Sequence, residues 1–375
     1  MAGIYIHIPF CKKKCHYCNF FSVASIKHRE EFVRVLLKEM EIRKDYLAGE
    51  KVNTIYFGGG TPSLLDISDL TLIIEQLAKY FAYEINSEIT LEANPDDITA
   101  AKAREWKNTG INRLSIGIQS FFDDDLQYLN RVHNARQALE AIRDIKDAGF
   151  ENLTIDLIYG IPGLTEEKWA KNLETFFTLD IPHLSAYSLT VEKKTPLALL
   201  IEKGKFSPPD ENLSVAHFNM LLDQARSNGF IHYEISNFAR EGYYSKHNSI
   251  YWLGGHYLGL GPSAHSFNGV SRQWNVSNIS RYISLDDFQT SVEEKEALTT
   301  EQQYNEYVMT SLRTIWGCDT AHIRNVFGEK FESYFLRNAL PFLERKHLYR
   351  DGPKYFLTDE GKLFADGIAA EMFYG

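Results

Sequence analysis

The sequence predicts an α/β fold, and two observations predict it. Between residues 1 and 190, short β-prone runs alternate six times with helix-like segments, and such alternation requires crossover connections between parallel strands. Polar or glycine-rich positions also stand at or near the carboxyl ends of five successive strands. The alternation by itself fits either a barrel or a doubly wound sheet. Beyond residue 190 we expect an added region that is mostly helical and carries a small β hairpin.

The elements of this first domain, 1–190, follow from apolar patterning and from the residues that interrupt it. The first helix places Phe32, Val35, Leu36 and Met40 on one stripe. The predicted strands are Gly3–Ile8, Val52–Phe57, Ser87–Glu92, Arg113–Ile118, Asn152–Leu157 and His183–Leu189. The predicted helices are His28–Leu47, Asp66–Tyr80, Thr99–Asn108, Asp123–Leu129, Ala135–Ala148 and Thr165–Thr178.

Two further domains are predicted, at 191–290 and 291–375. The domain at 191–290 is expected to extend the first one, and the last domain is expected to be small and winged-helix-like. The charged stretch Glu293–Glu296 is typical of a linker. The elements predicted in these domains are a connection at 193–210, helices at 212–228, 301–314, 320–327 and 331–342, a strand at 231–235, a hairpin at 348–357 and a last helix capped by Thr358.

Composition restricts the class of protein. Of 375 residues, 44% are hydrophobic and 24% charged, which is typical of a soluble globular chain. The net charge of -10 disfavours a nucleic-acid-binding surface, because few basic residues are in excess to neutralise phosphates. No apolar run approaches the length of a membrane anchor, and the first residues do not resemble a signal peptide. We therefore expect a cytoplasmic protein.

Three of the four cysteines lie in one loop, Cys11-Lys-Lys-Lys-Cys15-His-Tyr-Cys18, which we call the Cys loop (residues 11–18). Bunched cysteines are typical of a metal site and not of a secreted disulfide framework. Three thiolates can hold three irons of a cubane cluster and leave the fourth iron open. The alternatives are a zinc site completed by His16 or His7, or a reactive dithiol. Cys318 is expected to be an ordinary packed cysteine.

The strand ends decide between these alternatives. The Cys loop, the Gly58-Gly59-Gly60-Thr61 turn, Glu92, Gln119 and Asp156 follow successive strands. In a parallel β/α barrel these ends converge on one face, where the chemistry is found. Each position also has an ordinary explanation as a turn or a helix cap. Their coincidence favours a cluster with a co-ligand over a lone structural zinc.

The Cys loop followed by a Gly-Gly-Gly-Thr-Pro strand end resembles the radical S-adenosylmethionine (SAM) superfamily. The resemblance implies a partial (βα)6 barrel in which Cys11, Cys15 and Cys18 hold a [4Fe-4S] cluster and SAM chelates the fourth iron. An electron from the cluster would then cleave SAM and release a 5′-deoxyadenosyl radical. Gly58, Gly59, Gly60 and Thr61 would face the ammonium group of SAM, which bare backbone can approach closely.

A closer resemblance, from about residue 5 to 282, is to the oxygen-independent coproporphyrinogen III dehydrogenase group and, within it, to the HemW heme chaperones. It implies that Tyr5 lies near the cluster and the sulfonium in a catalytic position. By the same resemblance Glu92 contacts SAM, and Gln119 and Asp156 bind its ribose hydroxyls. The resemblance also implies that Arg131 faces the carboxylate of SAM, which a guanidinium can bind through two parallel hydrogen bonds.

Two features separate the chaperones from the dehydrogenases. The dehydrogenases carry a further cysteine at the position where this chain has Phe20. They also have an N-terminal extension before the first strand, whereas the first predicted strand of this chain begins at residue 3. His247-Asn-Ser-Ile-Tyr-Trp252 also fits the HNxxYW motif associated with heme binding in HemW proteins, and imidazole is a common heme-iron ligand. The alternative for His247 is a hydrogen-bonded loop histidine, and His256 and His265 are lesser ligand candidates.

The sequence therefore predicts a heme chaperone with a [4Fe-4S] cluster, SAM and heme as cofactors. Its expected partners are heme, heme-acceptor proteins, with respiratory proteins as one candidate class, and an electron donor. The alternative is an enzyme, a coproporphyrinogen III dehydrogenase that decarboxylates propionates to vinyl groups. A structural zinc or iron-sulfur protein is the third possibility.

Overall fold

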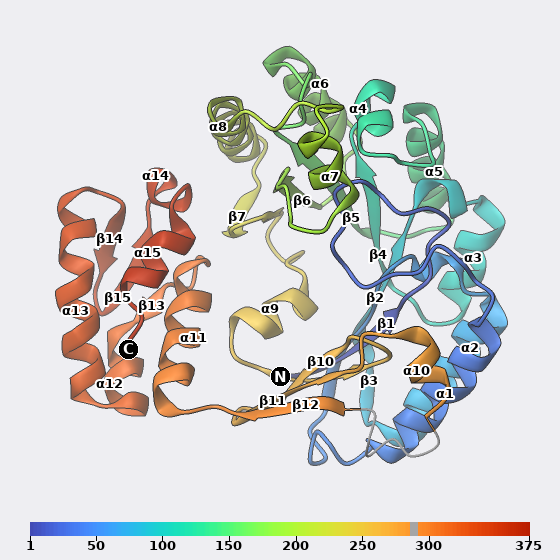
Figure 1. The fold of residues 1–375 in the computed structure, drawn as a ribbon, viewed down its shortest axis with the longest axis horizontal. Helices are drawn as coiled ribbons and strands as arrows, with labels where there is room; N and C mark the ends of the chain where they lie inside the picture. Colours follow the sequence, from blue (N-terminus) through green and yellow to red (C-terminus); the bar gives the residue numbers. More distant parts are fainter. Residues whose placement is uncertain (286–291) are drawn as a thin grey trace.

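The computed structural model describes residues 1–285 and 292–375. Six parallel strands, β1 to β6, lie in chain order in the middle of a 12-stranded sheet (Figure 1). In the described residues no ladder joins β6 back to β1, so the predicted parallel (βα)6 arrangement is present as an open, partial barrel. These strands are β1 (Ala2–Ile8), β2 (Val52–Gly59), β3 (Tyr83–Ala93), β4 (Arg113–Gln119), β5 (Asn152–Tyr159) and β6 (His183–Ser188).

Helices connect these strands and lie on one side of the sheet (Figure 1). Their starts are marked by caps: the side chains of Thr99, Asn134 and Thr165 each accept a backbone N–H of the first turn. The predicted helices are all present, although the first is shorter than expected. They are α1 (Arg29–Ile42), α2 (Ile67–Tyr80), α3 (Ala100–Asn108), α4 (Asp123–Tyr128), α5 (Ala135–Asp147) and α6 (Glu166–Thr178).

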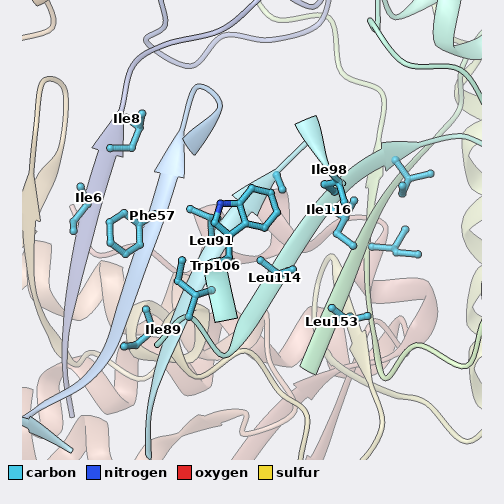
Figure 2. Close-up of a cluster of buried hydrophobic side chains, with 14 of the residues drawn as sticks. Ile6, Ile8, Phe57, Ile89, Leu91, Ile98, Trp106, Leu114, Ile116 and Leu153 are labelled. Carbon is cyan, nitrogen blue, oxygen red and sulfur yellow. The ribbon is translucent and has the colours of Figure 1, made fainter. Parts of the chain in front are cut away.

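The strands have an apolar outer face and a mostly polar inner face. Outward residues such as Ile6, Phe57, Leu91 and Leu114 are fully buried beneath the helices, where Trp106 of α3 lies among them (Figure 2). Side chains in a strand alternate sides, so the residues between these point into the barrel. The inner face therefore carries the polar groups, and the site is built from them.

Two further groups of strands flank the parallel core. β9 pairs in parallel with β1, and β8 pairs antiparallel with β6, so both edges of the partial barrel are covered. The predicted connection at 193–210 contains a short helix, α7. The flanking elements are α7 (Pro196–Glu202), α8 (Glu211–Ser227), β7 (Ile231–Glu234), β8 (Asn237–Ala239), α9 (Lys246–Trp252), β9 (His256–Leu260), β10 (His265–Phe267), β11 (Ser271–Asn275), α10 (Ile279–Ile283) and β12 (Val292–Ala297).

The linker prediction for Glu293–Glu296 is wrong, because these residues form most of β12, which pairs antiparallel with β11 at the edge of the sheet. Their charged side chains are largely exposed, as is common for an edge strand that must not recruit another chain. The predicted domain boundary at residue 290 lies outside the described residues.

The last part of the chain has its own hydrophobic core and a three-stranded antiparallel sheet. The predicted hairpin is present, and Cys318 is buried in this core, as expected. Arg313 stacks its guanidinium 5.7 Å from the ring of Trp252, which joins this part to α9. The elements are α11 (Thr300–Leu312), β13 (Cys318–Asp319), α12 (Thr320–Phe327), α13 (Glu329–Glu344), β14 (Leu348–Asp351), β15 (Lys354–Leu357), α14 (Asp359–Lys362) and α15 (Ala365–Glu371).

Candidate cofactor-binding site

A cavity of about 410 Å³ opens at the carboxyl ends of the parallel strands. It is bounded on one side by the Cys loop, which follows β1, and on the others by residues at the ends of β2 to β6. Ten of the thirteen residues predicted for the cluster, SAM and heme line it. These are Cys11, Cys15, Cys18, Gly59, Gly60, Thr61, Glu92, Gln119, Arg131 and Asp156.

Backbone hydrogen bonds fix the Cys loop at the rim of this cavity. Cys11 N–H donates to the carbonyl of Val23 over 3.0 Å, and His16 N–H donates to the carbonyl of Leu129 over 3.1 Å. All four cysteines of the chain are free thiols. Burial raises the pKa of the Cys11 and Cys18 thiols, so metal binding must release protons there.

The three thiols do not form a ready-made site for one ion. A zinc ion needs every ligand within about 2.3 Å of a single point, whereas each thiolate of a cubane binds a different iron. Among the residues that the structure describes, no three His, Cys, Asp or Glu side chains converge closely enough to hold a metal ion. Three thiolates from one loop match the three corners that a cubane with one open iron requires of the protein.

Arg131 is held at the back of the Cys loop. Its Nη1 donates to Sγ of Cys15 over 3.3 Å, and its Nη2 donates to Oδ1 of Asn94 over 2.6 Å and to the carbonyl of Gly117 over 2.9 Å. Its Nε is buried without a hydrogen-bond partner. A buried guanidinium with an unused donor on a cavity wall suits an anionic ligand such as a carboxylate.

Gln119 and Asp156 stand on neighbouring strands at the far wall. Gln119 has a left-handed backbone conformation with φ of 64°, and its side-chain Oε1 is buried without a partner. Asp156 accepts from the hydroxyl of Ser115 over 3.4 Å, and burial raises the pKa of its carboxyl to about 6. Unused acceptors here suit the hydroxyl groups of a ligand.

Glu92 ends β3 on the inner face. Its Oε1 accepts from the hydroxyl of Tyr56 over 2.8 Å, and its Oε2 accepts from the N–H of Gly59 over 3.2 Å. Burial raises the pKa of this carboxyl to about 7, and the nearby Asp156 carboxyl adds to the effect. Burial thus disfavours the ionised form of Glu92, and a cationic ligand group beside it would stabilise that form.

The glycine turn is shaped by the strand beside it. Gly59 has φ of +108°, and a Cβ there would lie 2.7 Å from the ring of His7. Thr61 donates its hydroxyl to Sγ of Cys11 over 3.6 Å and accepts from Nδ2 of Asn94 over 3.2 Å. The turn thus ties the Cys loop to the ends of β2 and β3.

Three predicted site residues are not among those that line the cavity in the described structure: Tyr5, Gly58 and His247. Tyr5 is half-buried inside the barrel, and its hydroxyl lies 3.2 Å from Nδ1 of His7. Gly58 packs against Tyr5 and Tyr56. His247 is buried on α9, and both of its ring nitrogens are hydrogen-bonded.

Asn94, Ser115 and Tyr187 are among the residues of the cavity wall that sequence reasoning missed. Asn94 could have been found, because it lies two residues after Glu92 and therefore on the same face of the chain. Ser115 and Tyr187 gave no comparable signal, since only their position on the inner face of a strand brings them here.

The residues present fit a [4Fe-4S] cluster together with SAM. Three thiols at separate positions suit the cluster. Arg131 and Gln119 each have a buried atom without a partner among the described residues, and these atoms suit the carboxylate and hydroxyl groups of SAM. The buried carboxyl of Glu92 suits its ammonium group. Within the described part of the chain, no helix is both long and apolar enough to cross a membrane.

Comparison with known proteins agrees with this geometry. Residues 5–176 match the family model of the radical SAM superfamily. The chain is 32% identical over 372 residues to the heme chaperone HemW of Bacillus subtilis strain 168, covering 98% of both chains. It is 30% identical to that of Mycobacterium tuberculosis H37Rv, over 99% of this chain and 94% of that one.

Among solved structures, coproporphyrinogen III oxidase (HemN) from Escherichia coli, a radical SAM enzyme, superposes with a TM-score of 0.86 at 23% identity. The match covers 99% of this chain and 90% of that one, and it establishes the shared fold. Identity of 30% or more to HemW proteins over nearly the full length, together with the matched radical SAM segment, shows the family of this chain. The chain belongs to the radical SAM superfamily, and within it to the family of HemW heme chaperones.

Proposed function

We propose that this chain is a heme chaperone, which binds heme and delivers it to acceptor proteins with the help of a [4Fe-4S] cluster and SAM. The observation that carries the proposal is that similarity to proteins named heme chaperone HemW extends over 98% of this chain and of its Bacillus relative. A shared domain alone would not support a shared function. Here the identity over the full length is 32% to a HemW protein, against 23% to the enzyme HemN.

The cavity residues have distinct parts in this proposal. Cys11, Cys15 and Cys18 hold the cluster, and the cofactor supplies one-electron chemistry that side chains cannot. Arg131 binds the carboxylate of SAM, and Glu92 binds its ammonium group. Gln119 and Asp156 orient the ribose.

Heme docks at the mouth of the same cavity. The ring of Phe20 is 64% exposed and Tyr187 is 43% exposed, and both line the cavity, which is unusual for large aromatic side chains. Lys13 and Lys14 line it too, and among the described residues neither ammonium group pairs with a carboxylate. Exposed rings suit the flat macrocycle of heme, and the free lysines suit its two propionates.

The proposal includes two kinds of protein partner, which are acceptor proteins that receive heme and an electron donor that reduces the cluster. Respiratory heme proteins are one class of acceptor. A reducing cytoplasm suits the four free thiols, because an oxidising compartment favours disulfides.

The test is anaerobic turnover of the cluster-loaded protein with SAM, a reductant and coproporphyrinogen III, with 5′-deoxyadenosine and tetrapyrrole products both quantified. We expect no protoporphyrinogen, and we expect transfer of bound heme to an apo acceptor in a parallel assay. Repeated formation of protoporphyrinogen would instead establish the dehydrogenase and overturn the chaperone.

A further inference from the structure

Helix α9, which carries the HNxxYW motif, closes the end of the barrel opposite the cavity. The backbone N–H groups of Lys246 and His247 donate to the carboxylate of Glu88 over 3.2 and 3.1 Å. Glu88 lies near the middle of β3, four residues before Glu92, on the same inner face. Figure 1 shows α9 beside the N-terminus, where β1 begins.

His247 projects from this helix into the barrel. Its Nδ1 lies 2.7 Å from Oγ1 of Thr54, and its Nε2 lies 2.9 Å from the hydroxyl of Tyr251. The side chain is 1% exposed, and burial lowers the pKa of the imidazole to about 3, so the ring is neutral. With both nitrogens occupied and no access to solvent, this ring cannot reach a heme iron in this arrangement.

Gly3 makes room for the imidazole. A Cβ at this position would lie 2.8 Å from Oγ1 of Thr54 and 3.3 Å from Cε1 of His247. The following inward residue of the same strand is Tyr5, whose ring stacks above His247 with centroids 6.3 Å apart. The first strand is thus shaped around the imidazole.

A stack of rings leads from His247 to the cavity. The imidazole lies 4.9 Å from the ring of Tyr56 at an interplanar angle of 24°. The hydroxyl of Tyr56 donates to Glu92, which lines the cavity. Since Thr54 and Tyr56 are alternate inward residues of β2, the hydrogen bond at Nδ1 and the stacking at Tyr56 hold the ring from two successive positions.

We propose that His247 is a positioning residue for SAM, which fixes Tyr56 and through it the carboxylate of Glu92, and that it does not ligate heme. The HNxxYW motif then belongs to the floor of the SAM site. This inference rests on the proposed SAM contact of Glu92, and it requires that heme docks elsewhere than on His247.

The test compares SAM and heme binding by the same variants. His247→Ala removes the stack and both hydrogen bonds, and His247→Gln restores one hydrogen bond. SAM binding is followed by equilibrium dialysis and by the change that SAM causes in the electron paramagnetic resonance spectrum of the reduced cluster. Heme binding is followed by the Soret band. We expect SAM affinity to fall about tenfold in His247→Ala and less in His247→Gln, with heme affinity unchanged.

Milder variants guard against misfolding. Thr54→Val and Tyr251→Phe each remove one partner of the imidazole at nearly constant volume, and we expect each to weaken SAM binding severalfold with normal cluster absorbance. Loss of heme binding with unchanged SAM affinity would overturn the inference, as would wild-type SAM affinity in all four variants. If the wild-type protein itself binds no SAM, the proposed SAM site fails, which is a different result from the failure of His247 alone.

Discussion

Arg131 donates a hydrogen bond directly to the sulfur of Cys15, with 3.3 Å between Nη1 and Sγ. The same guanidinium reaches Asn94 after β3 and Gly117 on β4, so one side chain joins the Cys loop to two neighbouring strand ends. A cation next to the proposed cluster ligand Cys15 stabilises its thiolate, and among the described residues the Nε donor of Arg131 has no hydrogen-bond acceptor. Cluster and SAM binding are therefore expected to depend on each other through this residue.

Arg131→Gln should weaken SAM binding about 10- to 100-fold, because each charge-assisted hydrogen bond contributes about 1.5–3 kcal/mol. Isothermal titration of the cluster-loaded protein measures the change. The matched control is Arg136→Gln on α5, where an exposed arginine pairs with Glu140. Equal losses in both variants would contradict a specific role for Arg131.

Cys15→Ala should abolish the absorption near ~400 nm that follows anaerobic reconstitution with iron and sulfide, because a cubane held at only two corners is labile. Cys318→Ala is the control, since this thiol is buried in the separate core of the last domain. Retention of one zinc per chain and no iron uptake by the wild-type protein would contradict the cluster assignment.

The stability of the protein without SAM should fall as pH rises through the range set by Glu92. Burial raises the pKa of this carboxyl from 4.5 to about 7. Between these values the folded protein holds a proton that the unfolded chain has released, so the free energy of unfolding decreases as pH increases. Above about pH 7 the full cost of the buried charge is present.

Glu92→Gln mimics the protonated carboxyl and should remove this dependence. Relative to Glu92→Gln, the wild-type protein should lose about 2–3 kcal/mol between pH 5 and 8, measured by chemical denaturation at each pH. Asp156, whose pKa is also raised, interacts with Glu92, so the difference between the two proteins reports the coupled titration of both carboxyls. A difference that stays constant with pH would show that Glu92 is not the titrating group.

Lys13 and Lys14 should contribute to heme affinity through the propionates. The double variant Lys13→Ala/Lys14→Ala should bind heme several-fold more weakly at low salt, with a smaller difference at high salt because exposed charges are screened. Lys51→Ala/Lys295→Ala makes the same change of charge at exposed positions elsewhere and serves as the control. Phe20→Ala should weaken heme binding at all salt concentrations. No change in either cavity variant would move the heme site elsewhere.

Much of the fold and of the cavity could be predicted because both follow from local sequence. Alternation of apolar and polar residues along strands sets which side chains face inward, and parallel strands bring their carboxyl ends together. That is why Glu92 and Asp156, which are 64 residues apart in the chain, were expected at one site and lie in one cavity. Thr358 likewise predicted a helix start by its capping chemistry, and its side chain accepts the N–H of Gly361 where α14 begins.

What sequence could not predict depends on contacts between distant segments. The HNxxYW motif gave no sign that His247 would enter the barrel, because the space for it is made by Gly3, more than 240 residues earlier. Glu293–Glu296 looked like a linker because the charges that protect an edge strand are also typical of a solvated segment. Neither the burial of His247 nor the strand at Glu293–Glu296 could be predicted from the neighbouring residues in the sequence.

The parallel pairing of β1 with β9 joins the first strand of the chain to one that is synthesised more than 240 residues later. The Cys loop follows directly after β1, so this edge of the strand that precedes it has no β9 partner until residues 256–260 have been made. Pairing over such a separation is slow to form, and an unpaired strand edge can recruit other chains. We therefore expect the Cys loop to reach its final position only after most of the chain has been synthesised.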